Sequence, residues 1–128
     1  MSLEQIPDLT ISFPFAQSRM STSDAIVVLM TAPTLEEARM LAEKLVETQL
    51  AACVQILPEM ESVYRWQGKV ERQREHLLLA KTTAERFAEL EREVRAMHSY
   101  DTPEIVSFPL SESSPDYLRW LEESVNRS

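Results

Sequence analysis

The chain has 128 residues and a formal net charge of −8, with one glycine, one cysteine and two histidines. This length fits a single domain that can bury a core without a disulfide or a structural metal. The acidity argues against nucleic acid or an anionic membrane surface as a partner, because both require clustered lysine and arginine. A single glycine excludes the Gly-rich loops that hold nucleotide phosphates, and a single cysteine excludes a disulfide framework.

The first 23 residues contain prolines and hydroxyl-bearing residues among apolar residues that follow no period. We therefore expect residues 1–23 to be a flexible leader and residues 24–128 to form one domain. The leader lacks the basic start and apolar core of a signal peptide. The longest apolar run, 25–30, is far shorter than the roughly 20 residues of a membrane span. We expect a cytoplasmic protein with no membrane partner.

The first part of the domain predicts a strand, a helix and a second strand. Residues 25–30 are a short, β-branched apolar run, which is typical of a central strand covered on both faces. Thr34 and Glu37 have the spacing of a capping box, and an apolar stripe then predicts a helix over residues 35–48. Residues 51–57 follow as the second strand.

A hairpin is predicted around Gly68, since glycine readily takes the positive φ of a tight turn. Tyr64 and Trp66 lie two apart before it and would face the same side of a strand. Residues 69–82 are longer than an ordinary strand, so we expect a bend or bulge at residues 72–74. Two interpretations stay open here: the hairpin folds onto its own core, or its aromatic residues dock on another subunit.

The second part of the domain repeats the pattern. Residues 82–85 again have capping-box spacing, and they precede a helix whose apolar stripe is Phe87, Leu90, Val94 and Met97. Residues 105–110 predict a strand in which Pro109 favours an edge position. The pair 114–115 predicts the N-cap and first turn of a short last helix with the apolar residues Tyr117, Leu118, Leu121 and Val125.

This order of elements predicts an α+β, ferredoxin-like βαββαβ fold with an antiparallel sheet, two helices on one face and an extra C-terminal helix. The apolar pattern of the first strand predicts that both of its faces are buried. Contact with a partner subunit is the simplest way to bury the second face. The topology also brings Met30, Gly68, His98 and Glu104 to one edge of the sheet. Lys81 is expected toward the opposite end.

The loop 98–104 gathers an imidazole, a phenol and two carboxylates. In one interpretation it only turns the chain, and His98 complements the dipole of the preceding helix. In the other, His98 joins Met97 and Met30 in a soft metal site suited to Cu(I). No nucleophile accompanies His98, so we do not expect an enzyme. Cys53 lies in an apolar strand, where we expect inert packing.

Six segments resemble the CutA family of divalent-cation tolerance proteins in order and spacing: 27–33, 50–54, 64–71, 81–83, 98–104 and 116–121. The resemblance implies a homotrimer similar to the PII signalling proteins, in which hairpin arms contact neighbouring subunits. In this chain the arm would contribute Tyr64, Trp66 and Gly68 to the interface. The resemblance also implies a role in metal tolerance, with copper as the expected metal.

Some members of the family are thought to bind copper through a cysteine at the position of Met30 and histidines at the positions of Met97 and His98. Only His98 is retained here, and the two thioethers suit Cu(I) better than Cu(II) or zinc. The first hypothesis is a trimeric metal-response protein that binds a soft cation through these three residues. The second is a PII-like module that binds a small ligand between subunits, in a cleft lined by Tyr64, Lys81, Tyr100, Glu104 and Trp120.

Overall fold

The computed structural model describes residues 24–126. Along the chain its elements are β1 (Ala25–Ala32), α2 (Leu35–Glu47), β2 (Cys53–Ile56), β3 (Met60–Trp66), β4 (Lys69–Thr83), a 3-10 turn (Ala84–Arg86), α3 (Phe87–Met97), β5 (Ile105–Pro109) and α4 (Pro115–Ser124). The predicted leader, residues 1–23, lies outside the described residues. Within residues 24–126, the helices are too short or too polar for any of them to span a membrane.

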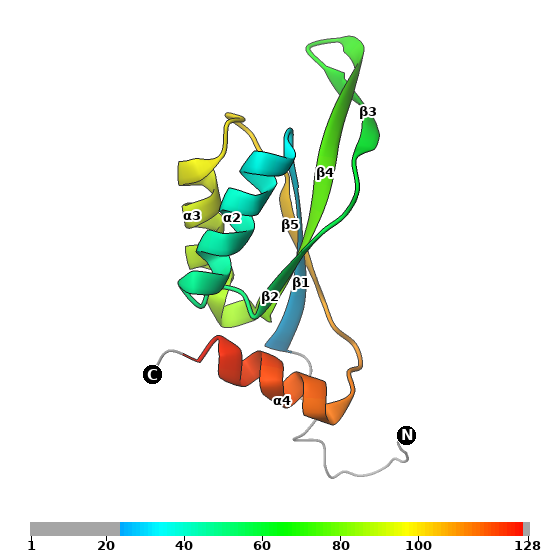
Figure 1. Cartoon of the computed structure of the whole chain (residues 1–128). Helices are drawn as coiled ribbons and strands as arrows, with labels where there is room; N and C mark the ends of the chain where they lie inside the picture. Colours follow the sequence, from blue (N-terminus) through cyan, green and yellow to red (C-terminus); the bar gives the residue numbers. More distant parts are fainter. Residues whose placement is uncertain (1–23, 127–128) are drawn as a thin grey trace.

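The strands form one antiparallel sheet in the order β2-β4-β1-β5, and β3 pairs with the part of β4 that lies beyond β1. Helices α2 and α3 cover one face of this sheet, and α4 lies across its lower end (Figure 1). The α+β, ferredoxin-like arrangement with an extra C-terminal helix is therefore confirmed. β5 is an edge strand, as Pro109 predicts, and it ends at Pro109 rather than at residue 110.

Strand β1 lies at the centre of both the sheet and the core. It pairs with β4 on one side and with β5 on the other. Alternate residues face the helices and join the main core, namely Ile26, Val28, Met30 and Ala32. On the opposite face Val27 and Thr31 are also buried, while Leu29 is partly exposed. The prediction that both faces of this strand are covered holds everywhere except at Leu29.

Helix α2 begins where the capping residue predicts. Thr34 is the N-cap, and its Oγ1 accepts a hydrogen bond from the Glu37 backbone N–H at 3.1 Å. The buried face of the helix is the predicted stripe of Ala38, Leu41, Ala42 and Leu45. The second half of the capping box is not formed, because the Glu37 carboxylate bonds instead to Ser99.

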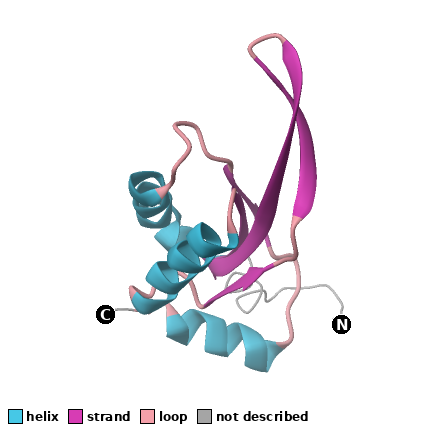
Figure 2. Ribbon diagram, turned by 45° about the horizontal axis from the view of Figure 1, so that its top comes forward, coloured by secondary structure: helices cyan, strands magenta, loops and turns pink. Residues whose placement is uncertain are grey.

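The hairpin of β3 and β4 projects beyond the rest of the sheet (Figure 2). Gln67 and Gly68 form its turn with φ values of 51° and 81°, the two positive values of a two-residue turn that matches strand twist. The bend or bulge predicted at residues 72–74 is absent, because each residue from 69 to 75 keeps a partner in β3. The 15-residue length of β4 is explained by a change of partner, since its second half pairs with β1 and β2.

Two further predictions about local structure are wrong. Thr82 does not cap a helix: it pairs with Ile26 inside the sheet, and α3 begins only at Phe87, after the 3-10 turn. Tyr117 does not belong to the buried face of α4, where it is 39% exposed. It is adjacent to the buried Leu118 in sequence, and neighbouring residues on a helix point about 100° apart.

Candidate functional site

The end of α3 meets the end of β1 through the side chain of His98. The Nε2–H of His98 donates to the carbonyl oxygen of Thr31 at 2.7 Å, and its Nδ1 accepts from the Tyr100 backbone N–H at 3.0 Å. These partners define the neutral Nε2–H tautomer, because a carbonyl oxygen only accepts and an amide N–H only donates. The His98 side chain is fully buried. Both of its ring nitrogens are therefore occupied by backbone groups.

Glu37 holds the same turn from the side of α2. Its Oε2 accepts hydrogen bonds from the Ser99 backbone N–H at 2.9 Å and from the Ser99 hydroxyl at 3.1 Å. The same oxygen lies 3.4 Å from His98 Nδ1. A carboxylate in the first turn of a helix is also favoured by the helix dipole. The turn that follows α3 is thus fixed to both α2 and β1.

Tyr100 extends this polar cluster to β4. Its hydroxyl donates to Glu75 Oε1 at 3.2 Å, and its ring centre lies 4.8 Å from that of His98. Glu75 is only 7% exposed. Burial, followed by the negative charge and hydrogen bond of Glu75, raises the pKa of Tyr100 to about 12. Tyr64 of the hairpin also contributes to this shift, which places it near Tyr100.

The residues of the hypothetical soft-metal site lie in one region, but they are not arranged as free ligands. Met30 is fully buried on the helix side of β1, and Met97 packs against the same core. His98 could bind a metal ion only if one of its two hydrogen bonds broke. Among residues 24–126, no three or more His, Cys, Asp or Glu side chains are grouped so that they could hold a metal ion.

A second cluster lies at the opposite end of the sheet, near α4. The Lys81 ammonium donates to Gln55 Oε1 at 2.6 Å and lies 6.0 Å from the centre of the Tyr117 ring. The Tyr117 ring is 5.4 Å from that of Trp120, and its hydroxyl is 3.7 Å from Cys53 Sγ. Burial, followed by the Cys53 hydrogen bond, raises the pKa of Tyr117 to about 12. Cys53 is partly exposed and contacts a phenol, which the expectation of inert apolar packing missed.

The residues predicted to line a ligand cleft are divided between the two ends of the sheet. Tyr64 and Tyr100 lie at the hairpin end, and Glu104 is exposed just before β5 begins. Lys81 and Trp120 lie at the α4 end, where the topology predicted Lys81. A single chain does not bring the five residues together.

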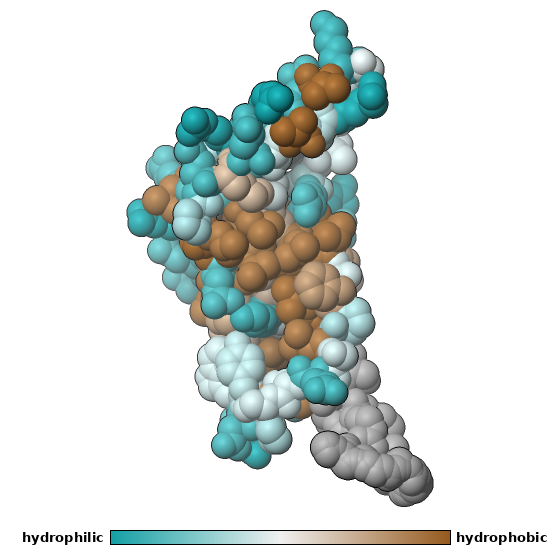
Figure 3. All heavy atoms as spheres, turned by 90° about the vertical axis from the view of Figure 1, so that its right-hand side faces the viewer, coloured by the Kyte–Doolittle hydropathy of each residue, from teal (hydrophilic) through white to brown (hydrophobic). Residues whose placement is uncertain are grey.

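The face of the sheet turned away from α2 and α3 is apolar (Figure 3). The strand register places Leu29 beside Leu79 and Val106, and it places Val27 beside Phe108. Val106 and Phe108 are 49% and 48% exposed. We call this surface of β1, β4 and β5 the open face. The hairpin also exposes apolar side chains, with Val63 and Val70 on one of its faces and Tyr64 and Trp66 on the other.

The family profile described as CutA1 divalent ion tolerance protein matches residues 26–124. The chain belongs to this CutA1 family. The divalent-cation tolerance protein CutA of Thermus thermophilus is 51% identical over 99 residues, which are 77% of this chain and 96% of that protein. CutA of Archaeoglobus fulgidus is 45% identical over 98 residues, 77% of this chain and 95% of the relative. Membership confirms the resemblance and a general role in divalent-cation tolerance.

Solved CutA1 structures share the fold described above. The crystal structure of CutA1 from Oryza sativa superposes with a TM-score of 0.80 at 41% identity and covers 84% of this chain and 99% of that one. The Thermus thermophilus CutA1 structure gives a TM-score of 0.78 at 49% identity, with 80% and 99% covered. The similarity therefore extends over almost the whole of each relative.

Several residues of these clusters were not predicted from the sequence. Local pattern predicts a helix cap for Glu37, a strand position for Glu75 and an apolar helix face for Tyr117. Their partners lie 62, 25 and 64 residues away, so no local spacing indicates the contacts.

Proposed function

We propose that this chain acts in divalent-cation tolerance as a homotrimer, in which the open face and the hairpin of each subunit pack on its neighbours. The supporting observation is the open face itself. Monomeric soluble proteins rarely expose a large contiguous apolar patch, and such patches usually mark interaction surfaces. Here the patch runs from β5 across β1 and β4, and more apolar side chains follow on the projecting hairpin (Figure 3).

The hairpin contribution is tested with Trp66→Asp, measured by native mass spectrometry. Trp66 is 52% exposed, so the substitution leaves the monomer fold intact while placing a charge in the proposed interface. We expect a shift from trimer toward monomer. Val46→Asp is the matched control, because Val46 is 43% exposed but lies on α2, away from the open face. A trimer that survives Trp66→Asp would show that the hairpin is an ordinary surface element.

For metal, we propose weak binding of Cu(I) by His98, Met97 and Met30 at the end of β1. Support comes from the softness of the two thioethers and from their place in one core, with Met30 buried inside it and Met97 packed against it. Binding requires His98 to release the Thr31 carbonyl oxygen, which is why the affinity is expected to be weak. A titration of Cu(I) against a competing chelator, on wild type and His98→Ala, tests this. Identical curves would exclude His98 as a ligand.

The alternative proposal is a small ligand held between subunits, as in a PII-like module. One observation favours it: the Lys81 ammonium lies 6.0 Å from the centre of the Tyr117 ring, and that ring is in turn 5.4 Å from the ring of Trp120. A neighbouring subunit would have to supply Tyr64, Tyr100 and Glu104. A metabolite screen by thermal unfolding tests this, because a ligand that binds only the native state raises its melting temperature. A Lys81→Met variant should lose any such rise.

We propose a binding protein rather than an enzyme, and a cytoplasmic location. In support of the first, the hydroxyl of Ser99 contacts Glu37 and the thiol of Cys53 contacts Tyr117, so neither contacts a histidine.

Relatives of this chain differ in the cellular location that is given for them. The relative from Arabidopsis thaliana is described as chloroplastic, and the Archaeoglobus fulgidus structure is described as periplasmic. Fractionation of the native cells is the direct test.

A further inference from the structure

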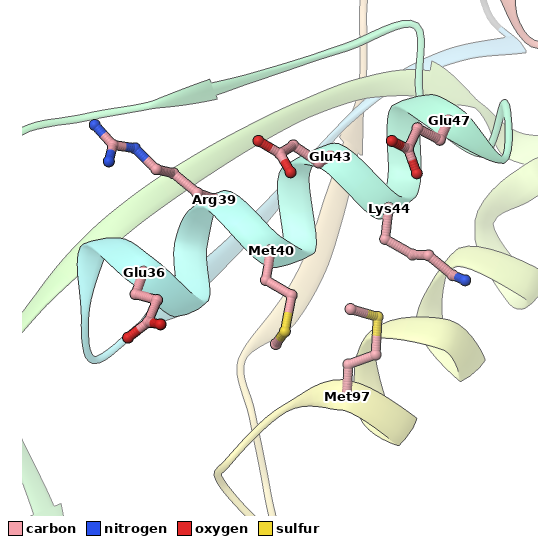
Figure 4. Close-up of a pocket in the computed structure, with 7 residues that line it drawn as sticks. All are labelled: Glu36, Arg39, Met40, Glu43, Lys44, Glu47 and Met97. Carbon is pink, nitrogen blue, oxygen red and sulfur yellow. The ribbon is translucent and has the colours of Figure 1, made fainter.

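The groove between α2 and α3 contains two methionine side chains that face one another. Met40 extends from α2 and Met97 from the end of α3, and both sulfur atoms lie in the space between the helices (Figure 4). The groove has a volume of about 340 Å³ and lies on the outer side of the helix layer. The open face and its proposed subunit contacts are on the other side of the sheet (Figure 1).

Core packing does not explain Met40. A methionine that fills a gap in a core is buried, whereas Met40 is 46% exposed and takes no part in the main core. Met97 is partly buried and packs its inner side against that core. The pair therefore presents two polarisable thioethers to a groove that solvent can enter.

The charges around the pair favour a cation. Of the side chains that line the groove, Glu36, Glu43 and Glu47 are acidic, whereas Arg39 and Lys44 are basic, so the lining carries one net negative charge. The Glu43 carboxylate points away from the two sulfur atoms (Figure 4). Lys44 also lines the groove, but its ammonium lies 4.0 Å from Glu93 of α3, which offsets its charge.

We propose that Met40 and Met97 bind a soft monovalent cation, Cu(I) or Ag(I), across the α2–α3 groove. Neutral thioethers select soft ions, and carboxylates nearby balance the charge without having to bind directly. This site differs from the one proposed on His98, because it requires neither the release of the Thr31 carbonyl oxygen nor any movement of the buried Met30. It is also independent of the trimer, since the groove belongs to one chain.

The test uses Ag(I), which does not change oxidation state, on the full chain carrying Cys53→Ser. That background is needed because a free thiol would compete for a soft cation. The methionine methyl groups are labelled with ¹³C, and their NMR signals are followed during the titration in chloride-free buffer. We expect the signals of Met40 and Met97 to shift together and to saturate at one ion per chain.

Two variants identify the ligands. Met40→Leu conserves volume at a half-exposed position, so the fold is retained while one sulfur is lost. It should move the saturation of the Met97 shift to at least tenfold higher Ag(I), whereas Met60→Leu, in β3, should leave the saturation unchanged. The proposal is overturned if neither methyl signal saturates, or if the Met97 shift saturates at the same Ag(I) concentration in Met40→Leu as in wild type, which would assign the ion to the His98 site instead.

Discussion

The imidazole of His98 and the carbonyl oxygen of Thr31, 2.7 Å apart, connect the end of α3 to the end of β1. The second ring nitrogen accepts from the Tyr100 backbone, and the side chain is fully buried. His98 therefore has a structural role in this conformation. The same residue can serve a metal only in a conformation in which the turn after α3 has opened.

Replacing His98 should destabilise the protein. His98→Ala removes two hydrogen bonds and leaves the carbonyl oxygen of the buried Thr31 without this partner, a loss of about 2 kcal/mol in the free energy of unfolding. Urea unfolding monitored by circular dichroism measures it. Ser99→Ala is the control, because it removes one exposed hydroxyl contact to Glu37 and keeps the backbone bond. Equal stability of His98→Ala and wild type would contradict the structural role.

The raised pKa of Tyr100 predicts a loss of stability at high pH. Folding raises this pKa from 10.0 to about 12, so the folded state holds the proton more tightly than the unfolded state. The contribution to stability is complete below pH 10 and is lost as pH rises toward 12. Tyr117 adds a loss in the same range.

The unfolding free energy of wild type should therefore fall between pH 10 and 11, and it should fall less steeply in Tyr100→Phe. Glu75→Gln should lower the pKa of Tyr100 in an absorbance titration of the phenolate, because the charge that opposes ionisation is gone. An unchanged titration in Glu75→Gln would show that burial alone causes the shift.

We expect that replacing the buried Thr82 by valine stabilises the protein. Its hydroxyl is fully buried inside β4 and has no hydrogen-bond partner among the described residues. Thr82→Val keeps the shape and removes the unpaired polar atom, which should raise the free energy of unfolding by about 1–2 kcal/mol. Thermal and urea unfolding test this beside Thr83→Val, a less buried neighbour where we expect little change. Destabilisation by Thr82→Val would mean that the hydroxyl has a partner.

We expect substitutions at the two central residues of the hairpin turn to have opposite effects on stability. Gly68 has a φ of 81°, and an added Cβ would meet no atom within 4 Å, so Gly68→Ala should cost about 1–2 kcal/mol through backbone strain alone. Gln67 has a φ of 51°, so Gln67→Asn should stabilise the turn, since asparagine tolerates this region better. Both effects are measured by urea unfolding. If Gly68→Ala had the same free energy of unfolding as wild type, this would contradict the positive φ of Gly68 in the two-residue turn.

The sequence predicted those secondary-structure elements that local patterns determine. Apolar patterns located β1, α2, α3 and α4, a capping residue located the start of α2, and the single glycine located the hairpin turn. The failures arose where tertiary pairing overrides a local motif. Thr82 has the spacing of a helix cap, but its pairing with Ile26 keeps it in the sheet. The polar cluster around His98 depends on Glu37 and Glu75, whose distance along the chain leaves no local pattern.

The native mass of the protein tests the homotrimer most directly. Wild type should have three times the mass of one chain by native mass spectrometry and by sedimentation. Phe108→Asp, which places a charge on the open face at a side chain that is 48% exposed, should shift the protein toward the single-chain mass, and Val46→Asp should not. A wild-type protein with the mass of one chain across micromolar concentrations would contradict the account.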